Sequence, residues 1–299
     1  MRYPLWPRSA SDEVFDDTLT YIWNGDVLGG RFEPNDVSWW KLTDEDDNGS
    51  FETLTLGTDR SNSVNFVAAD LPWLAARPTV KSELTTVNTV TASSLGGLNI
   101  TFPEAWFADY IKLTDFDATN MDVNNATSLK DMFKGDALLT NLVGTDSWHT
   151  DKVTDFSGMF SGNAALNQES LDRLAAWNVS QATTMASMFE GCAQLETVAI
   201  EHDALISTVL YDRMFANCIA LESVTVTNEK NGVSTIRESA FVNCASLARL
   251  NLSGGLKTIE ANAFEGCTSL DFTIGASVTT IGANAFKGWT DAQTITSLI

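Results

Sequence analysis

The chain has 299 residues, of which 44% are hydrophobic, so it is long enough to bury a substantial core. Its 39 acidic and 18 basic residues give a formal net charge of −21, which would repel phosphates, so we expect no nucleic-acid partner. No apolar run approaches the roughly 18 residues of a membrane span, so we expect no membrane insertion, and no signal peptide is visible in the chain.

Residues 1–100 predict a small β-rich N-terminal domain that caps the rest of the chain or attaches it to something larger. The runs "DTLTYIW", "DVSWWKL", "SFETLTL" and "SVNFVAA" alternate in polarity between turn residues, as strands do, and we expect the tryptophans here to be mostly buried. The stretch "DEDDNGSFE" places Asp44, Asp46 and Asn48 at the spacing that opens a calcium loop, but Thr55 stands where such a loop needs a glutamate. A turn between two strands explains the same residues, and both interpretations stay open.

Residues 101–299 repeat a pattern of 22–29 residues that is anchored on a phenylalanine. The anchors are Phe107, Phe133, Phe160, Phe189, Phe215, Phe241, Phe264 and Phe286. Six residues after every anchor but the last stands a leucine. Three positions further on stand Phe116, Leu142, Val198, Val224 and Leu250, with Phe272 one position early, and two beyond these Ile200, Val226, Leu252 and Ile274 complete the strand pattern L-x-x-L-x-L. We therefore predict a mainly β fold with short helices: a leucine-rich-repeat solenoid of about eight coils, preceded by the N-terminal domain.

Two polar columns accompany the anchors. Four cysteines stand three residues after an anchor, at Cys192, Cys218, Cys244 and Cys267. Because one cysteine falls in each coil, the spacing does not fit a metal site, and we interpret them as buried, reduced packing groups, with a disulfide between adjacent coils as the alternative. Threonine stands six residues before seven of the eight anchors, where the hydroxyls of stacked coils can bond along the array or bind ordered water.

The repeats are not uniform along the chain. Early ones carry Trp148 and Trp177 twelve residues before the anchor, later ones carry isoleucine five residues before it, and the change falls near "STVLYDRMF". The third coil is interrupted by "NQESLDRLAAWNVS", which we interpret as an inserted helix in place of the regular strand.

These segments resemble a known family. The segment "GTDSWHTDKVTDFSGMFSGNAAL" resembles the tryptophan-bearing repeats of bacterial surface proteins, and "VSTIRESAFVNCASLARLNL" resembles the BspA-type leucine-rich repeat. The resemblance covers about residues 101–299 and implies an extracellular or cell-surface, non-enzymatic protein concerned with adhesion. The family consensus defines no binding residues, so none is transferred to this chain.

We do not expect an enzyme, because the two histidines, His149 and His202, lie in different repeats beside no nucleophile motif. No catalytic, metal-binding or cofactor-binding residue is assigned. We predict a surface-exposed adhesion or recognition protein that binds a protein or glycan on another surface through its solenoid. The alternative is a structural decoration, fibre or spacer component that is incorporated into a larger assembly, either a cell surface or the surface of a virion.

The candidate partner-binding residues are polar positions between the strand leucines and in acidic turns. They are Asp115, Asp117, Asp122, Thr197, Ser223, Thr225, Arg249 and Asn251. Because stacking constrains regular coils while insertions vary freely in shape, we also expect contacts from residues 167–178 and 227–232.

Overall fold

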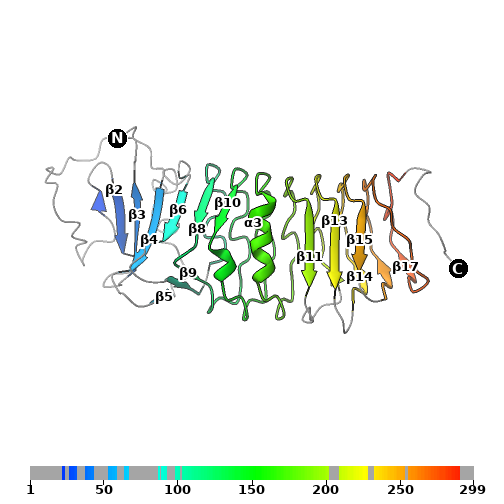
Figure 1. The fold of residues 1–299 in the computed structure, drawn as a ribbon, viewed down its shortest axis with the longest axis horizontal. Coiled ribbons are helices and arrows are strands. Elements are labelled where there is room, and N and C mark those ends of the chain that lie inside the picture. The colour runs from blue at the N-terminus through cyan, green and yellow to red at the C-terminus, as the bar shows by residue number, and fades with distance from the viewer. Residues whose placement is uncertain are drawn as a thin grey trace.

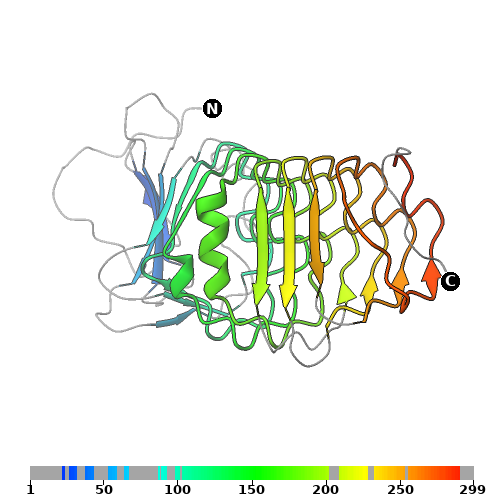
Figure 2. The ribbon, with the colours of Figure 1, turned by 45° about the vertical axis from the view of Figure 1, so that its right-hand side comes forward.

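The computed structural model describes residues 22–23, 27–31, 38–43, 53–58, 64–66, 87, 89–92, 98–101, 103–201, 209–227, 232–252 and 255–289. These residues form an elongated solenoid whose coils stack side by side along one axis (Figures 1 and 2). The described part is mainly β with short helices, which confirms the predicted fold class.

The first face of the solenoid opens with a sheet of seven described strands in the order β1–β2–β3–β4–β6–β8–β10. These strands are β1 (Ile22–Trp23), β2 (Val27–Arg31), β3 (Ser38–Thr43), β4 (Thr53–Thr58), β6 (Thr89–Ala92), β8 (Asp115–Asp117) and β10 (Asn141–Val143). The pairs from β1 to β4 are antiparallel, whereas β4, β6, β8 and β10 run parallel. The sheet is therefore continuous across residue 100, between the predicted N-terminal domain and the repeats.

A helical segment interrupts this face after β10. It consists of the α-helix α3 (Gln168–Asp172) and the 3-10 helix η2 (Arg173–Ala176), which confirms the predicted insertion. The face then resumes as a three-stranded parallel sheet of β11 (Thr197–Glu201), β13 (Ser223–Thr227) and β15 (Arg249–Leu252). Figures 1 and 2 show α3 standing beside β11 in the place of a strand.

The second face carries the threonine column. Its strands are β12 (Val209–Leu210), β14 (Thr235–Ile236), β16 (Thr258–Ile259) and β17 (Thr280–Ile281), and isolated bridges from Ser128 through Asp155 to Thr184 continue the same column in earlier coils. A separate sheet of β5 (Val64–Phe66), β7 (Leu98–Ile100) and β9 (Met121–Asp122) lies nearer the N-terminus, and the 3-10 helix η1 (Thr145–Ser147) follows β10. The Thr154 hydroxyl donates to the Thr127 carbonyl at 3.1 Å, and the Thr183 hydroxyl donates to the Thr154 carbonyl at 3.0 Å. The predicted bonding of hydroxyls along the array is thus confirmed.

The third face is the turn around each anchor phenylalanine. At each of the seven described junctions between anchors, the backbone N–H groups of the anchor and of the residues two before and two after it donate to carbonyls of the next coil. The anchor bonds themselves measure 2.8–3.0 Å, from Phe107 N to Met132 O through to Phe264 N to Ala285 O. Three hydrogen bonds per junction therefore fix the phase of one coil against the next.

This turn needs two left-handed residues in every coil. The position two before the anchor has positive φ in all eight repeats, at Ala105, Asp131, Gly158, Ser187, Arg213, Ser239, Asn262 and Asn284. The position two after it does likewise, and glycine or asparagine occupies it in every repeat except the first, which has Asp109. Glycine and asparagine adopt this conformation at low cost, so the turn chemistry explains the column two after the anchor, whereas the column two before it also contains alanine, aspartate, serine and arginine.

The core of the solenoid is built from the predicted apolar columns. The eight anchor rings stack in one unbroken row, with successive centroids 5.4–5.9 Å apart and interplanar angles of 3–15°. The leucine column is buried from Leu113 to Leu270. Trp148 and Trp177 stack at 5.7 Å in a second aromatic column.

The predicted count of about eight coils is slightly too high, since the solenoid has about six regular turns. Five strands and the helical segment follow the first six anchors on the first face. After the seventh anchor, Asp271 forms only an isolated bridge with Arg249. The strand weakens there because Phe272 stands one position earlier than the register requires.

Each of the four predicted N-terminal runs contains a described strand, at β1, β3, β4 and β5. Residues Asp44, Asp46 and Asn48 lie outside the described residues, but β3 and β4 on either side of them pair, with Thr43 opposite Thr53. Thr55 belongs to β4. The side chains of the N-terminal tryptophans also lie outside the described part of the chain, so their burial stays a prediction.

Truncating an interior anchor is expected to cost much more than truncating the last one. Phe215 is fully buried between two anchor rings, whereas Phe286 is partly exposed and stacks on a single described anchor. Phe215→Ala should lower the free energy of unfolding by roughly 3–5 kcal/mol, the range for a large-to-small change in a core, and Phe286→Ala by clearly less. Urea denaturation of both variants measures the difference, and equal losses would contradict the stacked column.

Candidate functional site

The structure brings five of the eight predicted binding residues together on the sheet β11–β13–β15. Thr197, Ser223 and Arg249 pair in one row across the three strands. Thr225 and Asn251 pair in the next row, beside Ala199. The surface is regular and carries small polar side chains, which makes it a weak candidate for a binding hot spot.

Asp115 and Asp117 lie apart from that group, because β10 and the helical segment separate β8 from β11. Their carboxylates are already engaged. Asp115 accepts hydrogen bonds from the Asn141 amide and the Thr114 hydroxyl, both at 2.6 Å. Asp117 accepts the Thr119 N–H at 2.9 Å. Both side chains thus stabilise local structure, and a role in binding stays a prediction.

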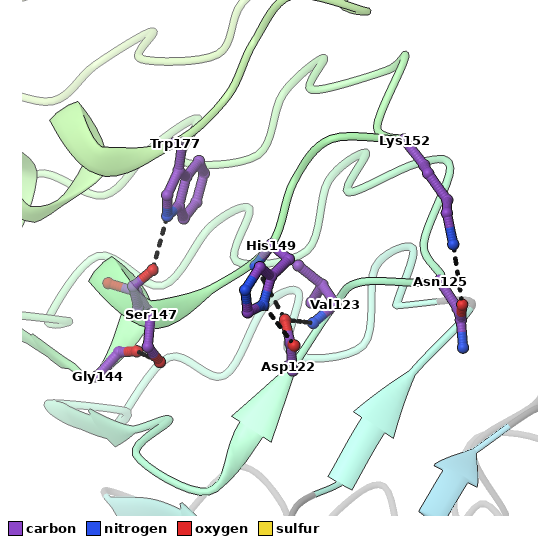
Figure 3. A network of polar contacts seen from close by, with 9 residues as sticks. Asp122, Val123, Asn125, Gly144, Ser147, His149, Lys152 and Trp177 are labelled. Carbon is purple, nitrogen blue, oxygen red and sulfur yellow. Dashed lines mark hydrogen bonds and ion pairs between the residues drawn. The ribbon is translucent and has the colours of Figure 1, made fainter.

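Asp122 lies on β9, in the separate sheet of β5, β7 and β9. Figure 3 shows its carboxylate between two coils, where it accepts the N–H groups of Val123 at 2.7 Å and His149 at 2.9 Å. Its second oxygen lies 2.8 Å from Nδ1 of the His149 ring. Nearby, Lys152 donates to Asn125 at 3.2 Å. The contacts of Asp122 with His149 and of Lys152 with Asn125 link adjacent coils, and a role of Asp122 in binding stays a prediction.

The irregular coil around α3 differs from every other described coil. Asn167 caps the helix by accepting the Ser170 N–H at 2.9 Å. The Ser170 hydroxyl accepts the Leu142 N–H at 3.0 Å and donates to the Thr140 carbonyl at 2.9 Å. Ser170 thereby satisfies two backbone groups on the edge of β10 that a neighbouring strand would otherwise pair.

Gln168 does the same for β11 on the other side of the helix. Its side-chain oxygen accepts the N–H groups of Glu196 at 2.9 Å and Thr197 at 3.1 Å, and its amide donates to the Thr197 carbonyl at 3.0 Å. Two polar side chains of a five-residue helix thus replace the start of the missing strand on both of its edges.

A groove of about 460 Å³ lies between the helical segment and β11, where the next strand of the first face would otherwise stand. Leu174, Ala175 and Trp177 line it from the helical side, Val198 and Ile200 from the strand. Three methionines, Met185, Met188 and Met214, complete its floor. This volume lies in the range of ligand-binding sites, and methionine adapts its shape to varied partners.

The inserted helix follows from the sequence pattern, whereas the groove beside it does not. The available signal was the anchor spacing, which is longest, at 29 residues, between Phe160 and Phe189. The other irregular segment predicted to make contacts, 227–232, lies largely outside the described residues, which stop at 227 and resume at 232.

The cysteine column contains no reactive centre. All four thiols are free and fully buried. Each donates to the backbone carbonyl of the anchor phenylalanine in the preceding coil, as Cys192 does to Phe160, at 3.0–3.3 Å. Burial raises the pKa of all four thiols, that of Cys267 to about 12. The alternative of a disulfide between adjacent coils is not realised.

Earlier coils place Asp136 and Asn163 in the same buried column. Asp136 accepts the Tyr110 N–H at 2.8 Å through one carboxylate oxygen, while the other has no hydrogen-bond partner among the described residues. Burial raises the pKa of Asp136 to about 9, the Tyr110 N–H opposes the rise, and the charge of Asp109 adds to it. Asp136 is therefore protonated in the folded protein near neutral pH.

No group of three or more histidine, cysteine, aspartate or glutamate side chains that could hold a metal ion occurs in the part of the chain that the structure describes. Of the two histidines, His149 is exposed and pairs with Asp122, and His202 lies outside the described residues. None of the described helices is both long enough and apolar enough to span a bilayer.

Stacked coils, in-register strands and a leucine column define this molecule as a leucine-rich-repeat β-solenoid. Residues 167–296 match the BspA type leucine rich repeat region in six copies. Residues 167–296 therefore consist of BspA-type leucine-rich repeats, which confirms the predicted resemblance. Residues 102–228 match a second family, described as a Mycoplasma protein of unknown function, DUF285. No curated protein matches the chain.

Three solved structures are distantly similar. A leucine-rich repeat protein from Eubacterium ventriosum is 15% identical, with 92% of this chain and 98% of that chain covered and a TM-score of 0.39. One from Bacteroides ovatus is 16% identical, with 83% and 90% covered and a TM-score of 0.33. A leucine rich cell surface protein from Faecalibacterium prausnitzii is 15% identical, with 85% and 94% covered and a TM-score of 0.25.

We expect the buried thiols to be inert in the folded protein. A thiol reagent such as 5,5′-dithiobis(2-nitrobenzoate) should label them only after denaturant is added, because neither access nor ionisation is available in the native state. Reductant should leave the melting temperature unchanged. The variant Ala245→Cys, at an exposed position next to Cys244, serves as a positive control and should label at once. Rapid labelling of the unmodified native protein would contradict the buried column.

The neutral carboxyl of Asp136 predicts a specific pH dependence. Its folded pKa of about 9 lies above the unfolded value, so its contribution to stability is complete at low pH and is lost as pH rises from about 4 towards 9. Asp136→Asn keeps an oxygen for the Tyr110 N–H but cannot ionise. Its stability relative to the natural protein should therefore increase with pH, by on the order of 1 kcal/mol per pH unit over that window.

Urea unfolding between pH 4 and pH 9 tests this expectation. Asp146→Asn, at an exposed position of η1, controls for the loss of one negative charge. If the stabilities of Asp136→Asn and of the natural protein change in parallel over the whole range, Asp136 is ionised in the folded state.

Proposed function

We propose that this protein is a non-enzymatic recognition protein at a cell surface or outside the cell, which binds a protein or glycan partner through its solenoid. The observation that carries the proposal is the groove of about 460 Å³ at the irregular coil. It lies in an array whose described coils, the irregular one included, are held in one phase by three hydrogen bonds at every anchor junction.

The placement of the groove supports binding rather than a defect of packing. The helical segment is capped by Asn167 and joined to both neighbouring strands by Ser170 and Gln168, so the sequence specifies the interruption. The apolar side chains of Leu174, Val198 and Ile200 line the groove and are only partly buried, so a bound partner could cover them. An apolar concavity on a rigid scaffold is the usual form of a recognition site.

Charge supports a basic partner. Residues 101–203, which contain the groove, carry 16 acidic and 5 basic side chains, a formal charge of −11. Such a surface accelerates the approach of a positively charged partner and repels acidic ones. The resemblance to BspA-type repeats supports the surface location and the adhesive role.

Filling the groove should abolish binding without unfolding the protein. Ala175 and Ala176 are neighbouring exposed residues of η2, but only Ala175 lines the groove. In Ala175→Trp the indole should occupy the groove, and the fluorescently labelled full chain should lose at least about tenfold in signal on linear-peptide and glycan arrays. Ala176→Trp is the matched control and should bind like the natural protein.

Melting temperatures show whether the two variants are equally folded. If folded Ala175→Trp binds the same array spots as Ala176→Trp, the groove is not the recognition site, and the alternative of a structural spacer gains support.

A further inference from the structure

We propose that the partner enters the groove as an extended peptide segment that pairs with the free edge of β11. This inference rests on the proposed function and names its mode of binding. The segment would have apolar side chains at alternate positions and lysine or arginine at the positions between them.

The orientation of β11 establishes which backbone groups face the groove. In a parallel ladder, alternate residues of a strand direct both N–H and C=O to the same side. Ser223 N donates to Glu196 O, so the odd-numbered residues of β13 face β11 and bond to Val198 and Ile200. Thr197 bonds to Gln168 on the opposite side. Ala199, two residues further along, therefore also directs its N–H and C=O towards the helical side.

Among the described residues, the backbone N–H and C=O groups on this edge of β11 have hydrogen-bond partners only at the start of the strand. Gln168 reaches Glu196 and Thr197, and α3 continues away from the strand into η2. Within the residues that the structure describes, β11 pairs with β13 alone, and no hydrogen bond joins the backbone of Ala199 to the helical segment. An exposed strand edge of this kind accepts an added strand.

The groove beside the edge selects the side chains of that strand. Thr197, Val198, Ala199 and Ile200 all line it, so a paired segment would lie along the apolar floor. Successive residues of an added strand point to opposite faces, so every second side chain would enter the groove. The remaining ones would lie at a rim that includes the exposed Asp172. With a net charge of −21, a second copy of this chain is a poor occupant, and a basic segment is favoured.

Two substitutions test the pairing. Ala199→Pro removes the N–H that faces the groove, and because this N–H does not bond to β13, the described sheet keeps its hydrogen bonds. Ala176→Trp, at an exposed residue that does not line the groove, is the control. A random linear 12-residue peptide display library, selected on the full natural chain, provides the probe.

We expect the selected peptides to alternate apolar with basic residues. They should bind Ala176→Trp within about twofold of the natural protein, and Ala199→Pro at least about tenfold more weakly, as loss of strand pairing requires. N-methylation of single peptide amides gives a second readout that does not depend on the folding of Ala199→Pro. Affinity should fall at alternate peptide positions, because only every second amide faces β11.

Two other outcomes separate this inference from the proposed function. If Ala175→Trp abolishes peptide binding while Ala199→Pro and N-methylation do not, the groove binds its partner without strand pairing, and only the present inference fails. If none of these changes affects binding, both the inference and the proposed site fail. Selection of acidic peptides without alternation would also overturn the inference.

Discussion

The hydrogen bonds between successive anchor turns are the constraint on which the rest of the solenoid depends. Three N–H groups of each turn donate to the next coil, so a coil cannot slip by one residue without losing all three and reversing its side chains. These bonds continue past the irregular coil, from Gly158, Phe160 and Gly162 to the carbonyls of the following coil. The first face can therefore change from strand to helix and back while the aromatic column stays unbroken.

The parts of the fold that follow from equal spacing could be predicted from the sequence. Residues at the same offset from the anchor occupy the same angular position on successive coils, which is why the phenylalanine, leucine and cysteine columns are buried as expected. The inserted helix was also predictable, because its apolar spacing departs from the strand pattern. Strand β6 was not, although Thr89 lies 26 residues before its partner Asp115, because no phenylalanine anchors that coil.

The candidate site was predicted only in part. A strand pattern shows which side chains point outward, and the strand register places Thr197, Ser223 and Arg249 in one row. It does not show which volume a helix leaves empty, so the groove could not be found before α3 was seen beside β11. Similarly, the sequence does not show that the Asp122 carboxylate on β9 meets the His149 ring of the next coil. The neutral state of Asp136 depends on burial, which composition does not reveal.

The replacement of a strand by α3 has a mechanical consequence. Within the described residues, the two sheets of the first face are joined across the helical segment by side-chain bonds of Ser170 and Gln168, whereas the anchor-turn ladder on the third face is continuous. Tension along the long axis would load these connections unequally. The first face would part at α3 while the third face still held, so the molecule would bend open there like a hinge. A partner bound between α3 and β11 would bridge that gap, and the contacts of the partner would then carry part of the tension.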